Sequence, residues 1–522
     1  MSAVIAQINI SSLLPKPKPI TESVIVGKDI LELLAGSMYV DPLNVYREYI
    51  QNAADAIDEA RDLGLLFDDT PGIKISFDHA ERVIRIRDNG ASIPSKEFCQ
   101  RLVAIGASQK RGTKLRGFRG VGRLSGLGYC QELVFRGRTD GDSKVTEIRW
   151  DGRALRGKMR DQQYVGDLAT LVKDVVTETR ISGDGFPARF FEVELRKISR
   201  LRNDILLNEE AVRSYISQVA PVPFGDKFSL AKEIDCKLEL RGIRPPICIE
   251  LDDGHGPIVH RVQNYIQFSD TVTDPIRGVE YVELLGMDGE VCAFGWIADH
   301  SYAGSIPKRL GLGGIRLRAG NIQVGDEKIL ASLFPESRFS GWAIGDIHVI
   351  SPKILPNGRR DDFEPTASYA HLQSELVLQA KKLTQRIRER SAHRNQLRAV
   401  QQNLGAVDVW LKMARDKPLP RIILQILQAL SQERLDKVFK ETERLAPDSE
   451  ESTATHDRLK KLTVLINTLS SQGKGEKIDS AISGSLEKPI TAALKTILSS
   501  AKSPDAGIGL SLEVLAAIEM VS

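Results

Sequence analysis

Hydrophobic and polar residues alternate along the first 223 residues with two different periods. Stretches with apolar residues at helical spacing predict helices, and stretches of strict alternation predict strands. In the helix over 41–64, Asp41 is expected as the N-terminal cap, Pro42 as the first helical residue and Gly64 as the stop. Helices are predicted at 22–39, 41–64, 93–106 and 208–224, and strands at 72–78, 82–90, 131–138, 144–152 and 188–198.

The pattern changes after residue 223. Helical periodicity returns over 366–445, and polar linkers are predicted at 446–455 and 471–485. Short apolar stretches predict strands at 237–242, 281–286, 291–298, 313–325 and 345–351. The chain is therefore predicted to be α+β, with a flexible arm at 1–20, a mixed domain at 21–223, a second mixed domain at 224–395 and a helical region at 396–522.

Length and composition restrict the class of protein. A chain of 522 residues is too long for one hydrophobic core, and 72 basic against 69 acidic residues leave a net charge of only +3. This balance does not favour nucleic acid as the main partner. The five cysteines are scattered without a CxxC pair, which predicts reduced thiols and no zinc site. Because we find no signal peptide and no run of about 18 apolar residues, we expect a soluble, cytoplasmic protein without membrane contact.

The helix predicted over 41–64 carries a polar stripe. Glu48, Asn52 and Asp55 fall within about 60° of one another on the helix, beside an apolar stripe. An exposed helix edge is the ordinary interpretation. The alternative is that the stripe borders the core and forms the floor of a cleft. The solvated positions are expected on the far side of the helix, at Arg47, Asp58 and Asp62.

Two further segments have both an ordinary and a functional interpretation. Asp88-Asn89-Gly90 is either a turn or a fixed carboxylate that accepts a hydrogen bond from an amine such as that of adenine. Residues 117–128 contain five glycines without the lysine of a P-loop, and their bare N–H groups could cradle phosphates. The basic stretch 105–117 is either a disordered loop or a mobile lid whose Lys110 reaches phosphate oxygens.

The order of these segments resembles the Bergerat ATP-binding fold of the GHKL superfamily, which unites gyrase, the HSP90 chaperones, histidine kinases and MutL. The motifs are E-x-x-x-N-x-x-D-A on a helix, D-x-G after a strand, a basic lid, and G-x-x-G-x-G opening a helix. Residues 30–56 look most like the HSP90 chaperones, and 354–364 are similar to their loop that places an arginine on the γ-phosphate. The resemblance implies a Bergerat-fold α/β sandwich, a ribosomal-S5-like, transducer-like mixed α/β middle domain and an α-helical C-terminal region.

The resemblance also assigns roles to matching residues. Glu48 would be the general base that deprotonates the attacking water, and Asn52 would bind Mg²⁺. Arg360, with Arg359 as its rival, would reach the γ-phosphate, and Asp88 would accept from the adenine amine. The other ATP-binding residues implied are Asp55, Gly90, Ile93, Gly106, Lys110, Gly117, Arg119, Gly120, Val121 and Gly122. Two positions depart from the family pattern: Ser92 replaces the second glycine of D-x-G-x-G, and Arg123 replaces an aromatic residue.

The implied function is a Mg²⁺-dependent, ATP-hydrolysing conformational clamp, chaperone-like, in which ATP closes a lid and couples to the middle domain. The implied partners are ATP and ADP, protein clients or partner proteins, and a second copy of the chain in an ATP-dependent homodimer. The alternative is a MutL- or gyrase-like ATPase acting with nucleic acid in repair or phage defence. A histidine kinase is less consistent, since a hydrolytic glutamate suits water activation. A catalytically idle nucleotide switch is the remaining interpretation.

Overall fold

Two compact units make up the computed structural model of the chain. The first contains residues up to 300 together with 304–381, and the second contains 301–303 and 382–522. The division into four parts made from the sequence stays a prediction. The predicted arm, the helix over 22–39 and residues 117–121 of the glycine-rich segment lie outside the described residues. The structure describes residues 41–66, 70–105, 122–200, 202–417, 419–442, 450–469, 487–501 and 503–521.

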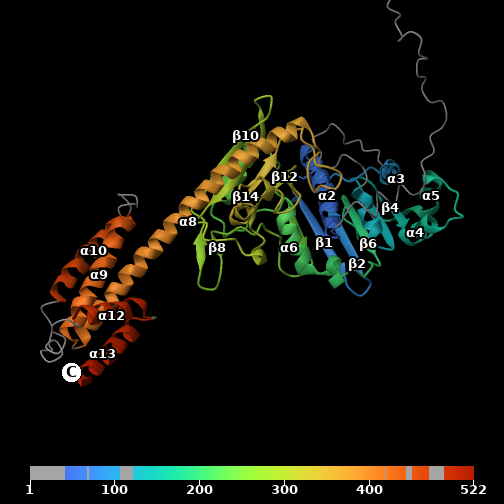
Figure 1. Cartoon of the computed structure of the whole chain (residues 1–522). Coiled ribbons are helices and arrows are strands. Elements are labelled where there is room, and N and C mark those ends of the chain that lie inside the picture. The colour runs from blue at the N-terminus through green and yellow to red at the C-terminus, as the bar shows by residue number, and fades with distance from the viewer. Residues whose placement is uncertain are drawn as a thin grey trace, which may run out of the picture. The chain divides into compact units, whose positions relative to one another are not determined.

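A seven-stranded sheet organises the N-terminal part of the first unit (Figure 1). Neighbouring strands are antiparallel, except that β7 pairs in parallel with β1. All five strands predicted before residue 223 are present, and β7 is contributed by residues beyond it. The order is β5 (Val176–Ser182), β4 (Lys144–Asp151), β3 (Glu132–Arg138), β6 (Phe190–Arg196), β2 (Val83–Asp88), β1 (Gly72–Asp78) and β7 (Cys248–Leu251).

Helix α2 (Asn44–Asp62) covers one face of this sheet. Its apolar side, including Ile50 and Ile57, joins alternate strand residues such as Ile75 and Ile84 in one core. The other helical elements of this part are α3 (Phe98–Val103), η2 (Gly122–Gly128), α4 (Gly152–Arg160), α5 (Leu168–Val175), η3 (Arg202–Leu207) and α6 (Glu209–Val219). Of these, α4 and α5 were not predicted, and α3 is shorter than predicted.

The ends of α2 follow the predicted signals with one shift. The Asp41 side chain accepts a hydrogen bond from the Leu43 N–H at 2.9 Å, so it stabilises the turn before the helix and the helix itself begins at Asn44. Gly64 stops the helix as predicted. Its φ of 65° turns the chain, and the Leu65 N–H then bonds the Ala60 carbonyl at 2.8 Å.

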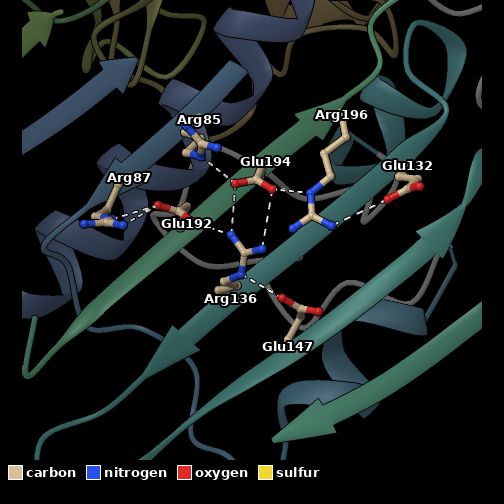
Figure 2. Close-up of polar contacts among 8 residues, drawn as sticks. All are labelled: Arg85, Arg87, Glu132, Arg136, Glu147, Glu192, Glu194 and Arg196. Atoms are coloured by element: carbon tan, nitrogen blue, oxygen red, sulfur yellow. Dashed lines mark hydrogen bonds and ion pairs between the residues drawn. The ribbon is translucent and has the colours of Figure 1, made fainter. Parts of the chain in front are cut away.

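Arginine and glutamate side chains form a network on the other face of the sheet (Figure 2). Arg136 on β3 donates to Glu147 on β4 at 2.7 Å, and to Glu192 and Glu194 on β6 at 2.9 Å and 3.0 Å. Arg85 on β2 donates to Glu194 from the opposite side at 2.6 Å. Burial raises the pKa of Glu194, but Arg136 above all, with Arg196 and Arg85, outweighs it and holds the pKa at about 2.

The remainder of the first unit contains a five-stranded mixed sheet. Helix α7 (Ala231–Leu240) packs against it through Ile234 and Leu238, which join Phe294 and Trp296 of the sheet in one core. The strand predicted at 237–242 is therefore wrong, because most of this segment belongs to α7. The strand order is β10 (Gly278–Leu285), β11 (Val291–Asp299), β14 (Ile344–Val349), β12 (Gly314–Ala319) and β13 (Ile322–Val324), with β8 (Tyr265–Gln267) and β9 (Thr273–Pro275) paired separately. Short 3-10 helices occupy Lys308–Leu310, Ala331–Leu333 and Ser337–Trp342.

The second unit is helical, as the periodicity beyond residue 366 predicts. The linker predicted at 446–455 is wrong from Glu450 on, where α10 begins. None of the described helices combines the length and apolar content that crossing a bilayer requires. The helices are α8 (Ala367–Asp416), which starts in the first unit, and α9 (Arg421–Thr442), α10 (Glu450–Leu469), α12 (Glu487–Ser500) and α13 (Pro504–Val521).

Candidate functional site

Glu48 lies on α2 between two guanidinium groups. Its side chain is buried, and its Oε1 is 3.8 Å from the Nε of Arg47 and 3.8 Å from the Nε of Arg360. Within the described part of the chain, Oε1 nevertheless has no hydrogen-bond partner. A buried carboxylate oxygen without such a partner is costly, so this position favours a water or ligand that donates a hydrogen bond.

The loop that carries Arg360 is held against α2 by its backbone. The Arg47 guanidinium donates to the carbonyl of Arg359 at 3.0 Å and to that of Arg360 at 3.5 Å. Arg360 adopts a left-handed conformation with φ of 56°, and its carbonyl also accepts from the Gly325 N–H at 2.8 Å. This conformation brings the Arg360 side chain to Glu48, whereas Arg359 contacts α2 through its carbonyl.

Asp88 ends β2 as a buried acid. Its Oδ1 accepts a hydrogen bond from the Gly90 N–H at 3.0 Å. Burial raises its pKa from 3.8 to about 7, and the Gly90 hydrogen bond opposes this shift. The neighbouring Asn89 fixes the strand end, since its side chain accepts from the Gly72 N–H at 3.0 Å and donates to the Thr70 carbonyl at 2.9 Å.

Gly90 and Ser92 show why the D-x-G-x-G pattern changes here. A Cβ at Gly90 would lie 2.6 Å from the carbonyl carbon of Ala56, so the glycine allows the loop to approach α2. The Ala91 N–H bonds the Ala56 carbonyl at 2.9 Å in the same contact. Ser92 has a φ of 62°, the left-handed region that favours glycine, and its hydroxyl donates to the Phe190 carbonyl at 2.8 Å. The serine thus adopts a backbone conformation that a glycine would reach without strain.

Element η2 begins at Gly122 directly beside Glu48. A Cβ at Gly122 would overlap Glu48 Oε2, so the glycine leaves room for the carboxylate. The Tyr49 hydroxyl donates to the Arg123 carbonyl at 3.1 Å and accepts from the Gly126 N–H at 3.0 Å, which fastens η2 to α2. The Arg123 guanidinium donates to the Ala104 carbonyl at the end of α3, and burial lowers its pKa to about 10.

The structure brings together three of the predicted site residues, Glu48, Gly122 and Arg360. Asn52 is half-buried and Asp55 is buried on the same helix, and Ile93 is half-buried after the Asp88 loop. The other predicted phosphate-contacting and lid residues lie outside the described residues: Gly106, Lys110, Gly117, Arg119, Gly120 and Val121.

The prediction that the far side of α2 is solvated is wrong for two residues. Arg47 and Asp58 are each only 4% exposed. Arg47 contacts the Arg360 loop, and Asp58 accepts from Arg61 at 3.1 Å. Arg47 and Tyr49, which position the site, were therefore not predicted from the sequence. The one feature of the sequence that pointed to them was that they flank Glu48. Helical periodicity cannot show that a loop distant in sequence covers the side of α2 opposite its apolar face.

Comparison with known proteins identifies the class of this region. Residues 42–168 match the family described as histidine kinase-, DNA gyrase B-, and HSP90-like ATPase. This part of the chain therefore belongs to the GHKL ATPase superfamily, and its seven-stranded sheet with helices fits the Bergerat fold.

The curated relatives are chaperones named HtpG. The protein of Verminephrobacter eiseniae is 32% identical over 139 residues, which is 23% of this chain and 21% of the relative. The protein of Enterobacter sp. is 27% identical over 233 residues, 41% of this chain and 33% of the relative. The chain thus spans about a fifth to a third of these relatives, and the family likeness is HSP90-like.

Proposed function

We propose that this chain binds ATP between α2 and the loop after Asp88, and hydrolyses it as a Mg²⁺-dependent conformational clamp. The observation that carries the proposal is the buried Glu48 Oε1, which lies between two arginines and has no hydrogen-bond partner among the described residues. A water donating to this oxygen would be held beside a base and a cation, which is the arrangement that hydrolysis of a phosphoanhydride requires.

The roles follow from the chemistry of each group. Glu48 accepts the proton of the attacking water, and Arg360 stabilises negative charge that develops on the phosphate. Arg47 is a positioning residue, because it holds both the Glu48 carboxylate and the backbone of the Arg360 loop. Asp88 accepts a hydrogen bond from the adenine amine. Asp55, Gly90 and Ile93 line the nucleotide, and Gly122 leaves room for its phosphates.

The site fits a magnesium ion that arrives with the nucleotide. Asn52, one turn after Glu48, offers an amide oxygen of the kind that Mg²⁺ binds. The described residues contain no group of three or more histidine, cysteine or acidic side chains placed to hold a metal, so phosphate oxygens would complete the coordination. When bound, the ion offsets the charge of the phosphates.

ATP binding would be coupled to the middle domain by the loop that carries Arg360. This loop and α2 come from segments more than 300 residues apart in sequence, and Arg47 joins them. Bound ATP would favour the arrangement in which Arg360 lies close to Glu48. Release of the nucleotide would weaken that preference. Since the relatives are named chaperones, the proposal includes protein clients and an ATP-dependent homodimer.

The test is ATP hydrolysis and ATP binding measured in parallel for the full chain. Glu48→Gln should bind ATP with nearly wild-type affinity and lose turnover by at least about 100-fold, because the base is removed while the shape is kept. Glu290→Gln, at an exposed position in the turn between β10 and β11, is the matched control and should hydrolyse ATP at the wild-type rate. Turnover in Glu48→Gln equal to wild type, or wild type that binds no ATP, would contradict the proposal.

A further inference from the structure

Arg189 lies directly before β6 and has no part in the hydrolysis proposed above. Its side chain is only 10% exposed. The guanidinium donates to the Leu65 carbonyl at 2.8 Å, to the Asn89 carbonyl at 3.5 Å and to the Asp140 carboxylate at 2.6 Å. One largely buried cation thus joins the chain after α2, the loop after β2 and the turn between β3 and β4.

The contact with Asn89 reaches the carboxylate of Asp88 through a single peptide group. The carbonyl that accepts from Arg189 and the N–H of Gly90 belong to the same planar peptide. That N–H donates to Asp88 Oδ1 at 3.0 Å. Because the peptide is rigid, a donor that fixes its carbonyl also fixes the direction of its N–H, and the same donor strengthens the bond to the carboxylate by polarising the peptide.

Arg189 also ties this peptide to the helix of the site. The loop after Asp88 already contacts α2 at one point, where the Ala91 N–H bonds the Ala56 carbonyl at 2.9 Å. Arg189 adds a second connection, because the Leu65 carbonyl lies just beyond the end of α2. The loop and α2 are the two walls between which the proposed function places the nucleotide, so one side chain holds both.

We propose that Arg189 is a positioning residue for base recognition, which holds the peptide between Asn89 and Gly90 so that Asp88 faces the amine of adenine. This inference rests on the proposed function, since that function assigns Asp88 to the base. Its consequence is selectivity for the base. A base with an amine gains the hydrogen bond to Asp88, and a base with a carbonyl in place of the amine does not.

The test compares the affinities of ATP and ITP for the full chain at pH 8, where Asp88 is largely ionised because its pKa is about 7. ITP keeps the sugar and phosphates of ATP but has a carbonyl in place of the amine. Wild type should bind ATP at least about tenfold more tightly than ITP, as one hydrogen bond to a charged group predicts. Arg189→Gln should reduce this ratio to within about threefold and leave the affinity for ITP unchanged.

Arg82→Gln is the matched control. Arg82 lies at the other end of the strand pair β2 and β6, where it also donates to a carbonyl and an aspartate, Ile198 at 2.8 Å and Asp204 at 2.8 Å and 2.9 Å. Its substitution should leave the ratio of the two affinities unchanged. Arg189→Lys keeps a positive charge beside Asp140 but replaces the guanidinium fork by a single ammonium group, so it should give an intermediate ratio.

The outcomes separate this inference from the proposed function. A wild-type ratio in Arg189→Gln, or in Arg189→Lys where the glutamine variant does not fold, would overturn the inference and leave the proposed function standing. Equal losses of affinity for ATP and ITP would overturn it as well, because a merely structural role weakens both. Wild type that binds ATP and ITP equally would contradict the role of Asp88 together with the inference, but not hydrolysis at Glu48. Wild type that binds neither nucleotide would contradict both.

Discussion

Asp88 lowers the stability of the folded protein at neutral pH, and under the proposed function this cost accompanies nucleotide binding. Its pKa rises from 3.8 to about 7 on folding, so the folded protein holds a proton that the unfolded chain releases. Stability therefore falls as the pH rises from about 4 to about 7, and stays low above that. Asp88→Asn should raise the free energy of unfolding by up to about 4 kcal/mol at pH 8, and by less at pH 5, while it abolishes ATP binding.

Urea unfolding at both pH values, with ATP binding measured at the higher one, checks this prediction. Asp226→Asn, an exposed acid in the same unit, should change neither quantity. An Asp88→Asn protein that is less stable than wild type at pH 8 would show that the carboxylate is compensated by a group other than the Gly90 N–H.

Local signals in the sequence single out Glu48 and Asp88, whose roles stay predictions. One signal is a polar stripe beside an apolar one, and the other is an acid at a strand end. Both can be recognised in the sequence without knowledge of the fold. Arg47 was placed in solvent because its partners, the carbonyls of Arg359 and Arg360, come from a distant loop. Gly90 was predicted to line the base, and the structure adds a second reason for this glycine, since a Cβ there would meet the backbone of Ala56 in α2.

Among the elements, the sheet network of Figure 2 has a testable energetic role. Arg136 contacts Glu147, Glu192 and Glu194, and the last two are each only 2% exposed. Removing Arg136 would leave buried carboxylates without their shared cation. We expect Arg136→Met to lower the free energy of unfolding by about 3–5 kcal/mol. Hydrogen exchange in urea, followed in peptides of β3 and β6, measures this loss.

Arg180→Met is the control for this change, because Arg180 lies exposed on edge strand β5 of the same sheet. Its effect should stay within about 0.5 kcal/mol. Equal losses of stability in both variants, or no loss in either, would contradict this prediction. Arg136 would then contribute no more than an exposed surface arginine, and the buried glutamates would be compensated by their other arginines.

The five strands predicted before residue 223 were confirmed, since their period of two reflects a sheet with one apolar face. Helix α7 was missed because KLELRG alternates over six residues, a length at which a helix end and a strand look alike. Its assignment depends on Ile234 and Leu238, which pack against Trp296 from β11. Long-range packing of this kind is not present in a local pattern. The same limit applies to α4 and α5, because they are only nine and eight residues long, a length at which a helical period is hard to recognise.

At the scale of the whole molecule, the proposed ATP site combines residues from both mixed parts of the first unit. Glu48 belongs to the nucleotide-binding part, and Arg360 reaches it from a loop after the middle sheet. We expect Arg360→Met to reduce the turnover of ATP by at least about 100-fold with little change in ATP affinity, because a cation acting on the developing charge is lost. Arg359→Met should remain within a few-fold of wild type, since Arg359 contacts Arg47 through its carbonyl, which the substitution keeps.

Steady-state hydrolysis together with equilibrium ATP binding separates these outcomes. Both substitutions remove one positive charge from adjacent positions, so a difference between them cannot arise from net charge. If Arg359→Met lost turnover and Arg360→Met did not, then ATP would rearrange the loop and exchange the two side chains. If neither lost turnover, hydrolysis would depend on the nucleotide-binding part alone, and the contact between Arg47 and the loop would hold the two parts together without taking part in catalysis.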